Sequence, residues 1–107
     1  MNTDPFYILK KDDIIEIGID HLDRLFIIPA HQHFEYIYRS AAEVGWDDKG
    51  NFLFSPKPRE WSYFDWYKHI VTIVKTEYGC TLLIKPQTLF SNISDELKEQ
   101  ILNFIID

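Results

Sequence analysis

Residues 62–80 read SYFDWYKHIVTIVKTEYGC, and this stretch predicts an amphipathic helix over residues 63–78. Ser62 is a preferred N-cap residue, and Asp65 three positions later completes a short-armed capping box. Gly79 is the residue type that ends a helix in the left-handed conformation. One polar stripe crosses the helix, and apart from Glu77 near its end all the remaining positions are apolar. A face this wide has to pack on a sheet or on a partner.

Three short apolar runs precede the helix and predict a meander of three strands, at residues 6–9, 14–19 and 25–28. In the second run, Ile15, Ile17 and Ile19 alternate with a charged residue and a glycine. Side chains two positions apart share one face of a strand. We therefore expect these three isoleucines to face the core.

A hairpin is predicted next, with strands at residues 43–47 and 51–54. They flank the turn Asp48-Lys49-Gly50, where Gly50 is suited to the positive φ that such loops require. Its inner face is expected to be aromatic, lined by Trp46, Phe52 and Phe54.

The segment before the hairpin fits two patterns. Phe34, Tyr36 and Tyr38 alternate as in a strand, whereas Phe34, Ile37, Ala41 and Val44 form a helical stripe. We favour a short helix near residues 33–41, after Pro29.

The last third of the chain predicts strands at residues 81–84 and 88–90 and a helix at 95–106. Ser94 caps this helix, and Leu97, Ile101, Phe104 and Ile105 are expected to form its buried stripe. The sequence thus predicts a single α+β domain over residues 1–107. It has an antiparallel sheet of about five strands, two main helices (63–78 and 95–106) packed on one face, and a short helix near 33–41.

Composition narrows the range of functions. The 107 residues have a formal net charge of −6, and residues 1–55 hold five basic and ten acidic side chains, so no nucleic acid partner is expected. The lone Cys80, the lack of a secretory leader and the short apolar runs lead us to expect a cytoplasmic protein with no membrane segment. Cys80, beside a helix end, is expected to be an inert packing residue.

Aromatic residues are concentrated, because 11 of the 17 lie between Phe34 and Tyr67. Rings can fill the core of a small domain, or they can form a ligand pocket or an interface. The second interpretation makes six residues candidates for a ligand or interface site: Trp46, Arg59, Trp61, Tyr63, Trp66 and Tyr67.

Other chemistry is weakly indicated. Lys57 and Arg59 form a basic pair beside the start of the 63–78 helix, where a small anion could bind, or they belong to a solvated loop. His31-x-His33, with His21, Asp20 and Asp23, lacks the spacing of a zinc site, and His69 is expected to be exposed. No cofactor, no metal and no catalytic motif is predicted, so an enzyme is not favoured.

The segment Ser55-Pro56-Lys57-Pro58-Arg59-Glu60-Trp61-Ser62-Tyr63-x-Asp65-Trp66 resembles a family of small proteins encoded on integron gene cassettes. Tyr38-Arg39-x-Ala41, Glu43-Val44-x-Trp46-Asp47 and Glu77-Tyr78-Gly79 add to the likeness, which spans residues 34–92. The resemblance implies a bacterial, cytoplasmic, mobile accessory protein with a compact and often oligomeric α+β fold. It supplies no active-site residues.

Three functions are compatible with these observations. The first is a non-enzymatic, self-associating binding module, most simply a homodimer, that uses Trp46, Trp61 and Trp66 for a small apolar ligand or a protein surface. The second is an acidic immunity-type or antitoxin protein that neutralises a basic partner. The third is an enzyme acting near His21, His31, His33 or Arg59. It ranks last because no nucleophile and base stand at a recognisable spacing.

Overall fold

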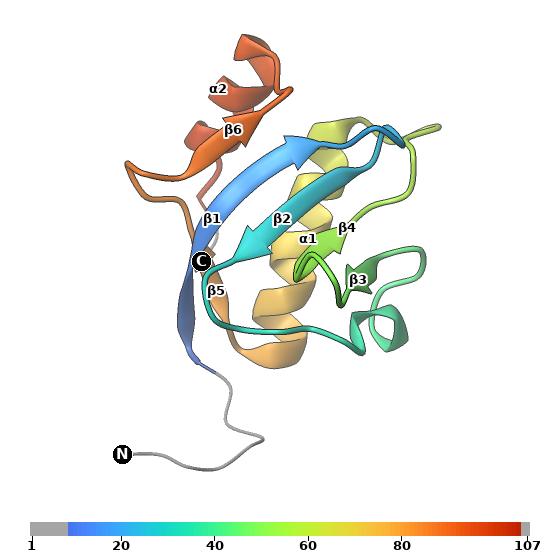
Figure 1. Cartoon of the computed structure of the whole chain (residues 1–107), viewed down its shortest axis with the longest axis vertical. Helices are drawn as coiled ribbons and strands as arrows, with labels where there is room; N and C mark the ends of the chain where they lie inside the picture. Colours follow the sequence, from blue (N-terminus) through green and yellow to red (C-terminus); the bar gives the residue numbers. More distant parts are fainter. Residues whose placement is uncertain (1–8, 106–107) are drawn as a thin grey trace.

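The sheet is assembled around β1 (Lys11–Ile19) in the computed structural model, which describes residues 9–105. On one side of β1, antiparallel pairing adds β2 (Leu25–Pro29), then β4 (Phe52–Phe54) and β3 (Gly45–Asp47). On its other side, β5 (Thr81–Leu83) pairs with the beginning of β1 and β6 (Leu89–Ser91) with its second half, both in parallel. The described residues therefore form a six-stranded mixed sheet (Figure 1).

Two helices complete the fold. α1 (Tyr63–Tyr78) crosses one face of the sheet, and α2 (Asp95–Asn103) packs against α1 (Figure 1). The predicted α+β class and both main helices are confirmed. β5 and β6 add parallel pairs to the expected antiparallel sheet, because α1 carries the chain back across the sheet after β4. Among residues 9–105, no helix combines the length and the hydropathy needed to cross a membrane.

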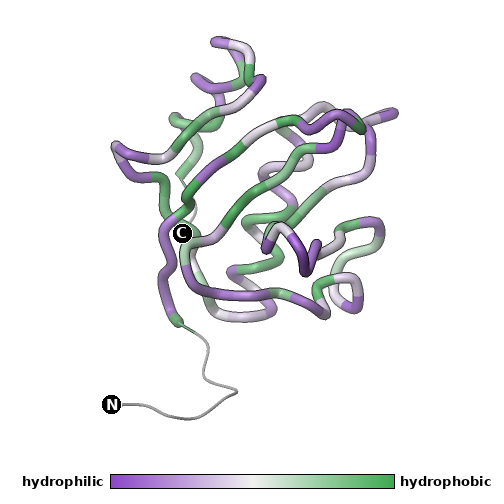
Figure 2. The backbone as a smooth tube through the Cα atoms, in the orientation of Figure 1, coloured by the Kyte–Doolittle hydropathy of each residue, from purple (hydrophilic) through white to green (hydrophobic). Residues whose placement is uncertain are grey.

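The N-terminal strand expected at residues 6–9 lies outside the described residues, apart from Leu9, which is not in a strand. The next two predicted strands are confirmed as β1 and β2. Figure 2 shows that β1 begins with hydrophilic residues, whereas β2 is hydrophobic along its length.

The expected isoleucine face of β1 is partly wrong. Ile14 and Ile17 are buried, with 2% and 0% of their surface exposed, whereas Ile15 is 47% exposed. The cause is a register shift between Ile14 and Glu16, where β1 uses one residue more than β2. Such a β-bulge turns the following side chains to the opposite face, so Ile14 replaces Ile15 in the core.

The hairpin is confirmed as β3 and β4, but its predicted inner face is not. Trp46 pairs with Leu53, so these two side chains share the face that packs on α1. Phe52 and Phe54, which neighbour Leu53 along the strand, lie on the opposite face. The left-handed residue of the turn is Asn51, with φ 57°, and Gly50 does not adopt positive φ.

The helix α1 begins and ends where the sequence predicts. Ser62 Oγ accepts a hydrogen bond from Asp65 N at 3.0 Å, and Asp65 Oδ2 accepts one from Ser62 N at 3.0 Å. This is a complete capping box. Gly79, at φ 67°, ends the helix in the left-handed conformation.

The segment before the hairpin is helical, as favoured, but only as the single turn η1 (Ile37–Arg39). The helical stripe predicted there is buried throughout: Phe34, Ile37, Ala41 and Val44. The alternating residues Tyr36 and Tyr38 are more than half exposed, which rules out the strand interpretation.

The helix predicted at 95–106 is shorter in the structure. It ends at Asn103, because Phe104 adopts extended backbone angles and turns its ring edge-on to Phe64 of α1, with the ring centroids 6.1 Å apart. Leu97 and Ile101 are buried as expected, but Ile105 is 80% exposed and does not belong to the stripe. Residue 106 lies outside the described residues.

Cys80 follows α1 and is fully buried. Burial, aided by the nearby Asp12 carboxylate, raises the pKa of its thiol to about 11. The thiol is therefore protonated at neutral pH, as expected of an inert packing residue.

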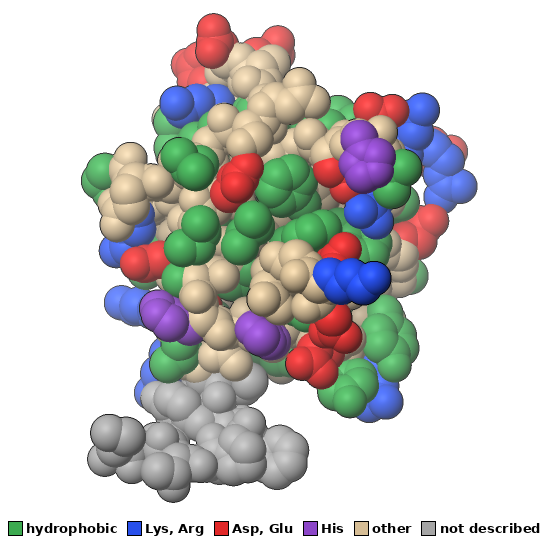
Figure 3. Space-filling view, in the orientation of Figure 1, with side chains coloured by type: hydrophobic (Ala, Val, Ile, Leu, Met, Phe, Trp, Pro, Cys, Tyr) green, Lys and Arg blue, Asp and Glu red, His purple; other side chains and the backbone are tan. Residues whose placement is uncertain are grey.

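The sheet face opposite α1 is not covered by a helix within residues 9–105 and carries what we call the open-face patch: Ile15, Phe26, Phe52 and Phe54. The three phenylalanine rings lie over glycines, since a Cβ atom on Gly18, Gly45 or Gly50 would come within 2.5, 2.4 or 2.4 Å of one of them. In Figure 3, hydrophobic side chains gather in the middle of this face, between acidic and basic ones.

The bulge predicts different effects for two neighbouring isoleucines. Ile17→Ala removes a fully buried side chain and is expected to lower the unfolding free energy by about 2–5 kcal/mol. Ile15→Ala, at an exposed position, is expected to cost less than about 1 kcal/mol. Urea unfolding followed by circular dichroism measures both, and equal losses would contradict the register of β1.

Candidate functional site

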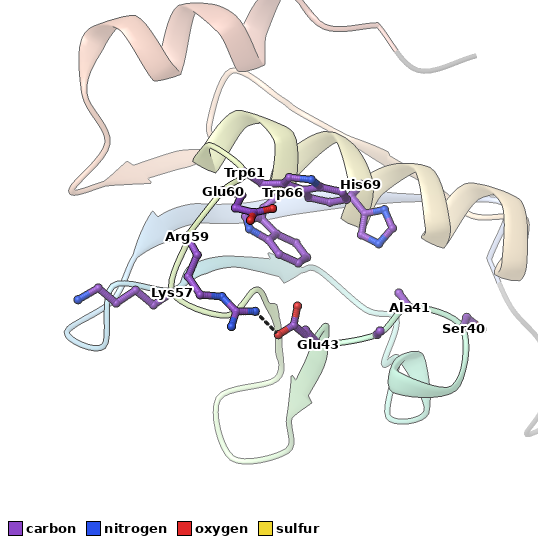
Figure 4. A pocket seen from close by; sticks show the side chains of 10 residues that line it. Ser40, Ala41, Glu43, Lys57, Arg59, Glu60, Trp61, Trp66 and His69 are labelled. Atoms are coloured by element: carbon purple, nitrogen blue, oxygen red, sulfur yellow. Dashed lines mark hydrogen bonds and ion pairs between the residues drawn. The ribbon is translucent and has the colours of Figure 1, made fainter.

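A cavity of about 620 Å³ opens beside the start of α1. Three parts of the chain form its walls: the turn at residues 40–43, the connector at 57–61 and the first two turns of α1 (Figure 4). Its lining comprises Ser40, Ala41, Ala42, Glu43, Lys57, Arg59, Glu60, Trp61, Trp66 and His69. We call it the tryptophan pocket.

Three aromatic rings build one wall of the pocket. Trp61 and Trp66 lie with their ring centroids 4.7 Å apart, and His69 stands edge-on to Trp61 at 5.2 Å. Trp66 is 7% exposed, whereas Trp61 is 45% exposed and presents its indole to solvent. Because Trp61 precedes the N-cap and Trp66 follows it by one turn, the capping box fixes this arrangement.

The indole N–H of Trp66 is buried and has no hydrogen-bond partner among the described residues. A buried donor without an acceptor costs about 1–3 kcal/mol, and such groups are uncommon in folded proteins. The wall of the pocket therefore contains a donor whose bonding capacity is unused. The indole N–H of Trp46 shares this property but lies outside the pocket.

An ion pair links the connector to the 40–43 turn, with Arg59 Nη2 2.8 Å from Glu43 Oε1 (Figure 4). Lys57 pairs outward with Asp23, at 3.4 Å. All four side chains are exposed, so each pair contributes little to stability. The pairs nevertheless occupy both basic groups of the connector.

Glu43 adopts φ 69°, the left-handed region that residues other than glycine seldom enter. Conformations of this kind cost about 1–3 kcal/mol and often occur at functional sites. Here the strained residue carries the carboxylate that holds Arg59 beside the pocket.

His69 is half-buried in the aromatic wall, not exposed as expected. Burial lowers the pKa of its imidazole below the usual value of 6.5, because the charged form loses hydration. The ring is therefore neutral at pH 7.

Of the six predicted site residues, Arg59, Trp61 and Trp66 come together in the pocket. The other three lie elsewhere. Tyr63 lines a separate surface hollow, and its hydroxyl donates to the Asp23 carbonyl at 3.0 Å. Tyr67 is 3% exposed within the core, where burial raises the pKa of its phenol to about 12. Trp46 packs edge-on against Phe34.

Sequence reasoning missed several lining residues, chiefly Glu43 and His69. His69 follows Trp66 by three positions, a spacing that places two side chains on one face of a helix. That signal was present in the sequence. Glu43 is 16 positions before Arg59, and only the folded chain brings the two together.

The alternative sites lose their ligand-binding groups to internal contacts. At the start of the helix, where a small anion was expected beside Arg59, the capping box uses the N–H groups of Ser62 and Asp65, and Arg59 is paired with Glu43. Asp12, 4% exposed, accepts hydrogen bonds from the backbone N–H groups of His31 and Gln32 and lies 3.1 Å from His31 Nδ1. It thereby anchors the loop after β2. Within residues 9–105, no three side chains of His, Cys, Asp or Glu converge as metal ligands.

Comparison with known proteins identifies related sequences. The sequence pattern of the family described as Integron Cassette Protein Hfx_Cass5 matches residues 12–88. A solved structure described as "Structure from the mobile metagenome of North West Arm Sewage Outfall: Integron Cassette Protein Hfx_Cass5" is 36% identical in sequence. The match covers 87% of this chain and 93% of that one, with a TM-score of 0.46. No curated protein matches the chain.

Proposed function

Because the chain belongs to the Hfx_Cass5 family of integron cassette proteins, we propose that it is a small accessory protein that binds, without catalysis, a small, partly apolar ligand in the tryptophan pocket. One observation carries this proposal. A cavity of about 620 Å³, within the size range of ligand sites, is walled by an exposed and a buried indole.

The chemistry of the wall supports a bound ring or apolar group. Trp61 offers a large rigid surface that buries area at little entropic cost. We place this activity in the cytoplasm, the reducing compartment that suits a chain whose one cysteine, Cys80, is unpaired.

The acidic first half motivates the alternative, an immunity-type or antitoxin role toward a basic partner. Basic groups of the second half lie against several of these acids: Lys57 at Asp23, Arg59 at Glu43, and Lys85 at Asp13. The uneven charge along the sequence is therefore more evenly distributed in space. This pairing favours the pocket function over the alternative.

We further propose that the chain self-associates as a twofold dimer through the open-face patch. In the sequence, the wide apolar face of α1 suggested self-association. The structure shows that the sheet and α2 cover most of that face. The uncovered apolar surface is on the other side of the sheet. Arg24 lies 4.3 Å above the ring of Phe54 and Asp47 faces the same side. A twofold axis pairs a patch with its own copy, and a rim with both charges suits that arrangement.

Ligand binding is tested by saturation-transfer NMR with a panel of small aromatic compounds. We expect at least one to bind the wild-type chain and to lose binding at least tenfold, about 1.4 kcal/mol, in Trp61→Ala. Leu89→Ala, at an exposed apolar residue outside the pocket, is the matched control and is expected to bind as wild type. A panel without binders, or equal binding by Trp61→Ala, would contradict the proposed function.

Self-association is tested by sedimentation velocity over the micromolar range. The wild type is expected to sediment as a dimer and both Phe52→Lys and Ile15→Lys as monomers, because a lysine in the patch would be buried without a partner. Leu102→Lys, at an exposed residue of α2 away from the open face of the sheet, serves as the control for an added exposed charge. Wild type that remains monomeric, or dimers that survive both patch substitutions, would exclude this interface.

A further inference from the structure

The charges around the tryptophan pocket do not balance once their ion pairs are counted. Among the lining residues, Arg59 is neutralised by Glu43 and Lys57 by Asp23. The remaining charged lining residue, Glu60, has no ion-pair partner among residues 9–105. The uncommitted charge at the pocket is therefore negative.

Glu60 is next to Trp61 in the chain, and its side chain lies at the aromatic wall in Figure 4. The exposed indole of Trp61 adds to the negative potential, because the face of an aromatic ring carries negative charge. Indole is the aromatic group that attracts cations most strongly. The Glu60 carboxylate and the indole face of Trp61 therefore both attract cations to the pocket.

The histidine of the wall does not oppose this attraction. His69, the third member of the aromatic wall, is neutral at pH 7 because burial lowers the pKa of its imidazole. Its neutral ring places no positive charge against an incoming cation. The net charge of −6 on the whole chain adds long-range attraction for cations.

From this arrangement, and resting on the proposed function, we infer that the ligand of the tryptophan pocket is an organic cation, an ammonium group joined to an apolar or aromatic body. The ammonium group would be held by the Glu60 carboxylate and the indole face of Trp61. The apolar body would cover the remaining surface of the aromatic wall.

An anionic ligand is the opposite possibility. It would have to take Arg59 from Glu43, at 2.8 Å, or Lys57 from Asp23, at 3.4 Å, and would leave the displaced carboxylate unpaired beside it. It would also bind next to Glu60. Both effects disfavour an anion.

Isothermal titration calorimetry at low ionic strength distinguishes the ligand classes with three probes of similar size: benzyltrimethylammonium, benzyl alcohol and benzoate. We expect benzyltrimethylammonium to bind about tenfold more tightly than benzyl alcohol, and benzoate to bind most weakly. Glu60→Gln is expected to remove most of the preference for the cation while leaving the affinity for benzyl alcohol unchanged. Glu77→Gln, in the last turn of α1 and outside the pocket, is the matched control and is expected to bind all three as wild type does.

Each other outcome has a definite meaning. Equal affinity for benzyltrimethylammonium and benzyl alcohol, tighter binding of benzoate, or an unchanged preference in Glu60→Gln overturns the inferred cation but leaves the proposed pocket function standing. Binding of none of the three probes overturns the inferred cation, and together with a failed aromatic panel it overturns the proposed function as well. Thermal unfolding confirms that the variants are folded, and Glu60→Ala replaces Glu60→Gln if that variant is not.

Discussion

The reciprocal hydrogen bonds between Ser62 and Asp65 fix the start of α1, on which the position of the aromatic wall depends. They satisfy backbone groups that the start of a helix leaves unpaired, and so decide where α1 begins. From that point the helical repeat places Trp66 and His69 on one face, while Trp61, just before the cap, turns back over them. The capped turn therefore fixes the start of α1 and with it the positions of the residues that form the aromatic wall of the pocket, while the buried apolar face packs the helix on the sheet.

The two faces of the sheet are packed differently. The face under α1 is a closed core in which Ile17, Leu53 and Val74 are fully buried. The opposite face has phenylalanine rings laid over glycines, an arrangement that fills the sheet surface without a second layer. The tryptophan pocket and the open-face patch share no residue. Ligand binding and self-association can consequently be tested one at a time in the same chain.

The sequence correctly predicted features that depend on neighbouring residues. The limits of α1 follow from Ser62, Asp65 and Gly79, and the grouping of Arg59, Trp61 and Trp66 follows from their closeness in the chain. Pairing between distant segments was not predictable in this way. The bulge that exposes Ile15 depends on the register of β1 against β2. Trp46 faces the core because it pairs with Leu53, Glu43 reaches Arg59 across the fold, and the parallel direction of β5 depends on where α1 crosses the sheet.

The central claim is that the capped turn holds Trp61 in place against Trp66 and His69 before any ligand arrives. Nuclear Overhauser effects between the ring protons of Trp61 and those of the other two rings, measured in the unliganded protein, test this claim most directly. We expect contacts from the Trp61 ring to both of the other rings. A Trp61 ring without either contact, and with the chemical shifts of an unfolded peptide, would contradict it.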